Sequence, residues 1–225
     1  MLHQIDIVSL LPEGRGSWDA AFALQKGAEA RVKAGGRETL FLLEHTDVVT
    51  AGRNADLGEL LVSEDLLLQR GVQLRITDRG GKLTFHGPGQ LVVYPVLDLS
   101  NGRRDVRQYV HDLEEVLILT AADFGVAAAR SAAPERWASV WVGNDKLAAI
   151  GVHLSRWVTT HGAALNVATD LARFSLFIPC GIADGGVTSL SGENPGNTPP
   201  ALPEVADCFV SHFLEVFERE KGDAP

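Results

Sequence analysis

The stretch "SVWVGNDKLAAIGVHLS", residues 139–155, decides most about the fold of this chain. Two runs of β-branched and other apolar residues flank a Gly-Asn-Asp sequence at 143–145, which is typical of a tight turn. The stretch therefore predicts an antiparallel hairpin. Side chains alternate between the two faces of a strand, so we expect Lys146 to share the apolar face of Ala148 and Ile150.

Helices and further strands are predicted on both sides of this hairpin. Ser17 is a suitable N-cap for the first helix, Gly125 a terminator for the second, and Pro203 fits the first turn of the last. Because helices and strands interleave without a repeat or a linker, we expect an α+β or α/β fold with a mixed sheet, as a single domain over residues 1–225. The predicted helices are residues 17–36, 105–125 and 203–220, and the predicted strands include 39–43 and 91–97.

The composition indicates a globular protein. The chain has 225 residues, 45% of them apolar and 22% charged, which is enough to bury one sizeable core. No apolar run approaches the ~20 residues that cross a bilayer. The first residues lack the features of a secretory signal, and two cysteines do not make a disulfide framework. We therefore expect a cytoplasmic protein that has no membrane partner.

The charge pattern bears on the class of partner. A net charge of −9 argues against nucleic-acid binding, which requires a basic surface. Positive charge is nevertheless concentrated at Arg103, Arg104 and Arg107. These arginines are either a docking patch for an acidic partner or ordinary solvated side chains.

The stretch "FIPCGIADGGVTSL", residues 177–190, contains one of the two cysteines. Cys180 stands between Pro179 and Gly181, which predicts an exposed bend instead of a core position. A cysteine nucleophile needs access for substrate and a nearby cation or base that lowers its pKa. Cys208 falls on the apolar face of the last predicted helix, where we expect a buried structural thiol.

Lys146 is the candidate cation, in a chain that has only five lysines. At the start of a core-facing row it is either a side chain that extends to solvent or a partly desolvated ammonium group. Desolvation lowers the pKa of a lysine and a neighbouring thiolate raises it, so a pair formed with Cys180 could exchange a proton near neutral pH.

Two further stretches are rich in small residues. In "DRGGKLTFHGPGQLVVYPVLDL", residues 78–99, glycines would let the backbone approach a ligand, and their amides could stabilise an oxyanion. His86 in this stretch is a general base, an orienting residue or an ordinary loop histidine. In "THGAALNVATDL", residues 160–171, the small residues at 162–164 leave room for a ligand or for a crossing backbone.

Together and in this order, the stretches resemble the lipoyl(octanoyl) transferase family, the octanoyl-[acyl-carrier-protein]:protein N-octanoyltransferases. The resemblance covers most of residues 40–190 and depends chiefly on the RGG…HGPGQ and PCGI elements. It implies a fold like the catalytic modules of lipoate and biotin protein ligases. It also implies a catalytic dyad of Cys180 and Lys146, and substrate-binding residues at Arg79, Gly80, Gly81, Lys82, Leu83, Thr84, Phe85, His86, Ala149, Ile150, Gly151, Gly162, Ala163 and Ala164.

The resemblance further implies the reaction. An octanoyl group would pass from octanoyl-acyl carrier protein, through a cysteine thioester, to a lysine of a lipoyl domain, which is the first step of protein lipoylation. The acceptors would be lipoyl domains of 2-oxoacid dehydrogenase complexes and the glycine cleavage H protein. We expect a monomer with no cofactor and no metal. One departure is Phe85, where the family usually has a tyrosine.

Three other functions fit parts of the sequence. An ATP-dependent lipoate or biotin protein ligase would not need Cys180. A hydrolase or acyltransferase with a Cys–His pair would use His86 or His161 as the base. A non-catalytic module that binds an acyl carrier would never become acylated.

Overall fold

The computed structural model describes residues 3–11, 14–100, 104–131, 133, 138–178 and 185–222. Its larger sheet has the strand order β12-β1-β2-β6-β10-β9-β8-β7, and β11 pairs with β9. Strand β1 is parallel to β2 and β12, and β11 is parallel to β9, whereas the other neighbours are antiparallel. The predicted mixed sheet is therefore confirmed. The strands are β1 (His3–Ser9), β2 (Glu38–Leu43), β6 (Gln90–Val96), β7 (Ala129–Arg130), β8 (Ser139–Val142), β9 (Asp145–Ser155), β10 (Val158–Asn166), β11 (Gly186–Val187) and β12 (Arg219–Lys221).

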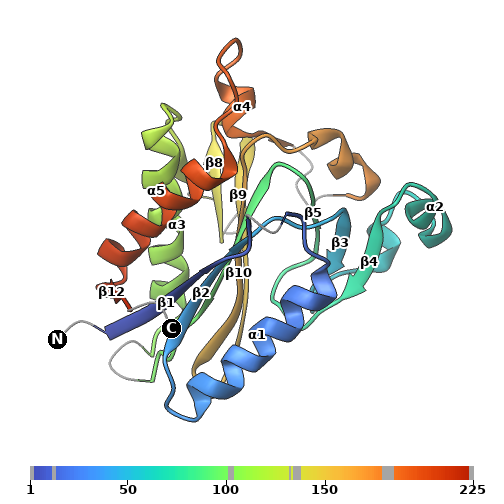
Figure 1. Ribbon diagram of the computed structural model, residues 1–225. Helices are drawn as coiled ribbons and strands as arrows, with labels where there is room; N and C mark the ends of the chain where they lie inside the picture. Colours follow the sequence, from blue (N-terminus) through green and yellow to red (C-terminus); the bar gives the residue numbers. More distant parts are fainter. Residues whose placement is uncertain are drawn as a thin grey trace.

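Helices cover both faces of the larger sheet. Helices α3 (Val106–Asp123) and α5 (Leu202–Val216) lie together on one face, and α1 (Trp18–Lys33) lies on the other (Figure 1). The core between the sheet and α3 and α5 contains the fully buried Leu113, Phe209 and Phe213. The core under α1 is smaller. A short helix, α4 (Leu190–Glu193), follows β11. No helix in the described part of the chain is long and apolar enough to cross a membrane.

The ends of the long helices follow the capping signals in the sequence. The Ser17 side chain accepts a hydrogen bond from the backbone of Ala20 at 3.2 Å and so caps α1. Gly125, with a φ of +74°, follows the end of α3. Helix α5 begins with proline in its first turn. The three helices are confirmed, but α5 ends at Val216, before the predicted end at residue 220, because Arg219–Lys221 form β12 and pair with β1.

A second, small sheet stands beside the larger one. Its order is β4-β3-β5, with bounds β3 (Val48–Ala51), β4 (Gln73–Ile76) and β5 (Leu83–His86). It has a core of its own, which includes Val49, Leu67, Phe85 and Phe177. Beside it are the helix α2 (Glu64–Gln69) and the 3₁₀ turns η2 (Leu57–Glu59) and η4 (Leu171–Leu176).

The predicted hairpin is formed by β8 and β9, but its pairing is irregular. Lys146 lies opposite Trp141 and Ala148 lies opposite Val140, so Leu147 is an extra residue on β9. A bulge of this kind interrupts the alternation of side chains. Leu147 and Ala148 are therefore both buried in the core that contains α3.

The bulge changes the face on which Lys146 lies. Across the hairpin, Ser139 pairs with Ala149 and Trp141 pairs with Lys146, and Trp141 donates a hydrogen bond from its ring nitrogen to the Ser139 hydroxyl at 2.9 Å. Lys146 therefore shares the face of Ala149, opposite to the face of Ile150. The sequence-based prediction that Lys146 shares the face of Ala148 and Ile150 is wrong, because strand alternation does not account for an inserted residue.

Candidate active site

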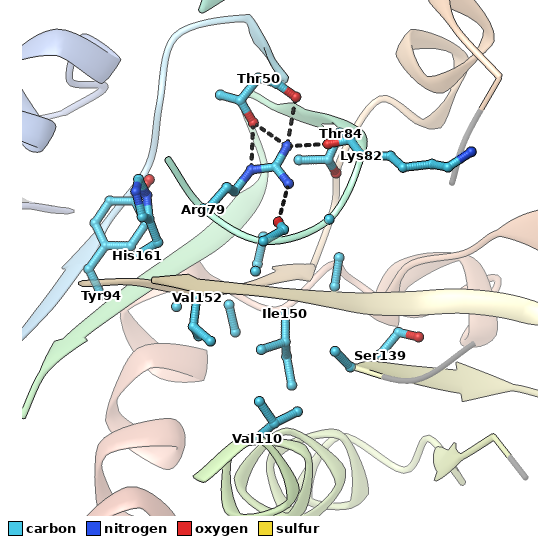
Figure 2. Close-up of a pocket in the computed structure, with 18 of the residues that line it drawn as sticks. Thr50, Arg79, Lys82, Thr84, Tyr94, Val110, Ser139, Ile150, Val152 and His161 are labelled. Atoms are coloured by element: carbon cyan, nitrogen blue, oxygen red, sulfur yellow. Dashed lines mark hydrogen bonds between the residues drawn. The ribbon is translucent and has the colours of Figure 1, made fainter. Parts of the chain in front are cut away.

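A cavity of about 470 Å³ lies between the loop at 79–82 and strands β9 and β10 (Figure 2). It brings together segments that are far apart in the sequence. The predicted site residues that line it are Arg79, Gly80, Gly81, Lys82, Thr84, His86, Lys146, Ala149, Ile150, Gly151, Gly162, Ala163 and Ala164.

Arg79 holds the loop at 79–82 in place. Its guanidinium donates to the backbone oxygens of Thr50 at 2.6 Å, Gly80 at 3.0 Å and Lys82 at 2.8 Å, and to the Thr50 hydroxyl (Figure 2). The Gly80 amide donates to the Val152 oxygen at 2.9 Å, which attaches the loop to β9. These contacts give Arg79 a structural role in shaping the cavity.

Strand β5 divides its residues between the cavity and the small core. Thr84 and His86 line the cavity, whereas Leu83 and Phe85 are turned into the core of the small sheet. The Phe85 ring packs edge-on against Phe174, with centroids 5.7 Å apart. The hydroxyl that a tyrosine would carry at position 85 is thus directed away from the cavity, and its loss does not affect the cavity wall.

His86 is a buried histidine at the cavity wall. Its Nδ1 lies 2.8 Å from the Gln90 side-chain oxygen. Burial, aided by the nearby His45, lowers the pKa of His86 to about 3, although the bond to Gln90 acts in the opposite direction. His86 is therefore neutral at physiological pH.

His161 forms a second histidine site in the same cavity. Its Nε2 donates to Asp78 at 2.7 Å, and its ring stacks on Phe22 with centroids 5.7 Å apart. Burial lowers the pKa of His161, and the Asp78 carboxylate opposes this effect. The backbone φ of His161 is +57°, in the left-handed region that non-glycine residues rarely adopt. Its amide is held there by a hydrogen bond to Gln25 at 2.7 Å.

Tyr94 and His45 form a buried pair beside this site. His45 Nδ1 donates to the Gly16 oxygen at 3.2 Å, so its Nε2 accepts a hydrogen bond from the Tyr94 hydroxyl at 2.8 Å. Burial lowers the pKa of His45 to about 4 and raises that of Tyr94. The pair is neutral, and Tyr94 contributes to the cavity wall.

Lys146 stands where the main cavity meets a smaller one of about 20 Å³. Its Nζ lies 5.1 Å from the centroid of the Trp141 ring. Phe177 and Val187 also line the smaller cavity. Val187 pairs with Lys146 between β11 and β9, and the Thr188 amide donates to the Lys146 oxygen at 2.9 Å.

The other candidates are either outside the described residues or away from the cavity. Cys180 belongs to residues 179–184 and lies outside the described residues, as does Arg103. Arg104 and Arg107 are exposed near the start of α3. Cys208 is half-buried on α5, where burial and the adjacent Asp123 raise the pKa of its thiol, so it is a poor nucleophile.

Several lining residues were not found by sequence reasoning. They come from the starts of α1 and α3, from β3 of the small sheet and from β6 and β9 of the larger one, and only the tertiary arrangement brings them together at the cavity. Figure 2 shows Val110 of α3 and Arg79 on opposite sides of the strand that carries Ile150 and Val152. The missed residues include Trp18, Thr50, Tyr94, Val106, Val110 and Leu154.

Among the described residues, no group of three or more His, Cys, Asp or Glu side chains is arranged to hold a metal ion. The chemistry available in the described cavity is that of an amine, neutral imidazoles, hydroxyls and backbone amides, next to an apolar wall from α3 and β9.

The chain is similar in sequence to proteins of one family. Residues 19–214 match the family model of the lipoyl protein ligase A/B catalytic domain. The chain is 45% identical to an octanoyltransferase from Solibacter usitatus, over 92% of this chain and 91% of that protein. It is 46% identical to an octanoyltransferase from Geotalea uraniireducens, over 95% of this chain and 98% of that protein.

Solved structures show the same fold. A lipoate-protein ligase A bound with ATP matches 100% of this chain and 89% of its own, with a TM-score of 0.77 and 16% identity. A bi-partite lipoate protein ligase from Thermoplasma acidophilum matches 100% of this chain and 87% of its own, with a TM-score of 0.75 and 16% identity. The expected likeness to the catalytic modules of such ligases is confirmed at the level of the fold.

Proposed function

Since the chain belongs to the octanoyltransferase family and carries a lipoyl protein ligase A/B catalytic domain, we propose that it transfers an octanoyl group from octanoyl-acyl carrier protein to a lysine of a lipoyl domain. The acceptors are lipoyl domains of 2-oxoacid dehydrogenase complexes and the glycine cleavage H protein. A thioester lies above an amide in free energy, so the transfer requires no ATP. This separates the reaction from that of the ligases with the same fold, which start from a free acid.

The nucleophile in this proposal is the Cys180 thiolate, and Lys146 is its proton acceptor. The main support is that the described chain on both sides of residues 179–184 borders Lys146. Phe177 and Val187 line one small cavity with Lys146, and Val187 pairs with it directly. Cys180 follows Phe177 by three residue steps, a span of at most roughly 11 Å. A thiol within that reach of the cavity can meet the Lys146 amine.

The reaction proceeds in two steps. Cys180 gives its proton to Lys146, and the thiolate attacks the thioester carbonyl of the carrier. The carrier thiolate leaves, takes the proton from Lys146, and octanoyl-Cys180 remains. The acceptor lysine amine then attacks this second thioester and gives a proton to Lys146. An amide forms and Cys180 leaves as the thiolate.

The loop at 79–82 offers limited help to the oxyanion of either step. The Gly80 amide is already bonded to the Val152 oxygen. The Gly81 amide, at a φ of +86°, is the candidate donor of this loop to the oxyanion. Backbone amides near Cys180 are the other candidates.

The apolar wall of the cavity suits an acyl chain. Val110, Ile150 and Ala163 line the part of it on the α3 face of the sheet, and Ala149 and Ala164 leave space on the face of Lys146. Burial of about seven methylenes at ~0.8 kcal/mol each would contribute roughly 5–6 kcal/mol before ordering costs. That magnitude is sufficient to discriminate chain lengths.

Acylation of a purified lipoyl domain tests this function. We expect octanoyl-carrier to octanoylate the acceptor lysine without ATP, and we expect free octanoate to give no product with or without ATP. Transfer of free octanoate that requires ATP and survives Cys180→Ala would instead identify a ligase.

A further inference from the structure

A chain of buried hydrogen bonds runs from the cavity wall to the segment beside Lys146. His86 Nδ1 lies 2.8 Å from the Gln90 side-chain oxygen, and Gln90 donates from Nε2 to the Asn166 side-chain oxygen at 2.9 Å. Asn166 in turn donates from Nδ2 to the Thr188 backbone oxygen at 2.9 Å. Gln90 and Asn166 are 2% and 4% exposed, so water does not compete for these groups.

The donor and acceptor of every hydrogen bond in this series are fixed by its last member, the Thr188 backbone oxygen. A backbone oxygen only accepts, so Asn166 must turn its nitrogen to Thr188 and its oxygen to Gln90. Gln90 must then present its nitrogen, whose second hydrogen goes to the Phe85 oxygen at 3.2 Å. The Gln90 oxygen is left facing His86 and requires a hydrogen on Nδ1.

We propose that Gln90 and Asn166 are positioning residues that hold His86 in its Nδ1–H tautomer, so that its bare Nε2 binds an N–H of the acceptor lysine amine. The assignment of this ligand rests on the proposed function. An octanoyl chain has no hydrogen-bond donor and a thioester carbonyl only accepts. Among the reacting groups of the two substrates, the amine alone can donate to Nε2.

The surroundings of His86 keep it neutral, as this role requires. Burial holds the pKa of His86 at about 3, and the nearby His45, with its ring centroid 5.8 Å away, Arg79 and His161 act in the same direction because each would repel a proton on His86. A neutral imidazole of such low basicity can orient the amine without taking its proton. The proton then passes to Lys146, whose backbone oxygen accepts from the Thr188 amide at the end of the same chain.

The tautomer can be read directly in the resting protein. Long-range ¹H–¹⁵N correlation spectra distinguish a protonated ring nitrogen from a bare one, and loss of signals in His86→Gln assigns this residue among the seven histidines. We expect Nδ1–H and a bare Nε2 between pH 5 and pH 8 (about 2 units or more above the pKa). A proton on Nε2 would overturn the proposal. The spectra require no substrate, so they are independent of whether octanoyl transfer occurs.

Gln90→Glu tests the functional consequence. A carboxylate beside Nδ1 favours the imidazolium, so the pKa of His86 should rise, and attack by the acceptor lysine should weaken as the pH falls toward the new pKa. We expect Gln90→Glu to lower the kcat/KM for the acceptor about fivefold to tenfold more than it lowers the rate of acyl-enzyme formation. A difference of this size corresponds to the loss of roughly one hydrogen bond. Gln108→Glu is the matched control, since Gln108 bonds Asp112 on the exposed side of α3.

An equal decrease in the rates of acyl-enzyme formation and of transfer to the acceptor would show a merely structural role for Gln90 and contradict the proposal. An unchanged pKa of His86 in a folded Gln90→Glu protein would contradict it as well. If this variant does not fold, the tautomer of His86 in the wild-type protein still tests the proposal. Failure of the proposed function would look different, because no acyl-enzyme would form in any variant.

Discussion

Lys146 and Trp141 are paired across the β8–β9 hairpin, and the Lys146 Nζ lies 5.1 Å from the centroid of the Trp141 ring. The face of an indole ring stabilises a nearby positive charge. The bulge at Leu147 is what brings the lysine to this face of the sheet, at the junction of the two cavities. A regular hairpin would direct the amine into the core beside α3.

Replacement of Lys146 should separate its charge from its ability to exchange a proton. Lys146→Met removes both, and we expect at least about a 100-fold loss in the rate of acyl-enzyme formation. Lys146→Arg keeps a positive charge that cannot be given up, so octanoyl transfer to the acceptor lysine should also fail. Rapid-quench measurement of each half-reaction checks this. Normal transfer by Lys146→Arg would exclude Lys146 as the proton acceptor.

Gly162 allows β10 to approach β6 closely. A Cβ at this position would lie 2.2 Å from the Val93 oxygen and 2.6 Å from Pro95 Cδ. Gly162→Ala should therefore lower the free energy of unfolding by about 1–3 kcal/mol. Gly27→Ala, inside α1 with no atom near the added Cβ, should raise it by about 0.5–1 kcal/mol. Urea titrations of the two variants should thus shift in opposite directions.

Stability should fall as the pH decreases below about 6.5, the ordinary pKa of histidine. The pKa values of His45 and His86 are lowered to about 4 and about 3 in the folded protein, so the unfolded chain binds protons that the folded chain does not. Each histidine should cost about 2 kcal/mol at pH 5 relative to pH 7.

Urea unfolding between pH 7 and pH 4 measures this dependence. His45→Gln should make it shallower, and His111→Gln at an exposed position should leave it unchanged. An identical slope in His45→Gln would argue against a neutral His45 in the folded state.

Arg79→Lys should disrupt the loop at 79–82 although the charge is kept. A lysine has no planar fork, so it cannot reproduce the bonds to the oxygens of Thr50, Gly80 and Lys82. We expect octanoyl transfer to fall by about 10-fold to 100-fold, from misplacement of the cavity wall. Arg75→Lys, at the exposed ion pair with Asp19, is the control and should retain activity. Full activity in Arg79→Lys would show that the loop shape is unimportant.

The exposed arginines near α3 should accelerate the encounter with an acidic carrier protein. Arg104→Glu combined with Arg107→Glu reverses their charge, so the association rate should fall most at low salt and its salt dependence should flatten. Stopped-flow measurements over a range of ionic strength test this. Unchanged rates at low salt would exclude electrostatic steering by these residues.

Local signals were sufficient to predict the main elements. The Ser17 cap, the Gly125 terminator and the proline in the first turn of α5 are short-range features, and the three long helices follow them. The turn at 143–145 similarly predicts the β8–β9 hairpin.

Long-range pairing was not predictable in the same way. The parallel pairing of β1 with β2 and the small sheet around β3 depend on contacts between distant segments. The bulge at Leu147 is invisible to a pattern of alternating residues, and it reverses the predicted orientation of Lys146. The left-handed backbone of His161 and the hydrogen bond between Gln90 and Asn166 likewise arise only from the tertiary structure.

Intact-mass spectrometry after incubation with octanoyl-acyl carrier protein is the sharpest test of whether Cys180 becomes acylated. We expect a mass increase of one octanoyl group that hydroxylamine removes, that maps to Cys180, and whose formation Lys146→Met strongly slows. A protein that octanoylates a lipoyl domain at a normal rate after Cys180→Ala, or that carries the octanoyl group on another residue, would contradict it.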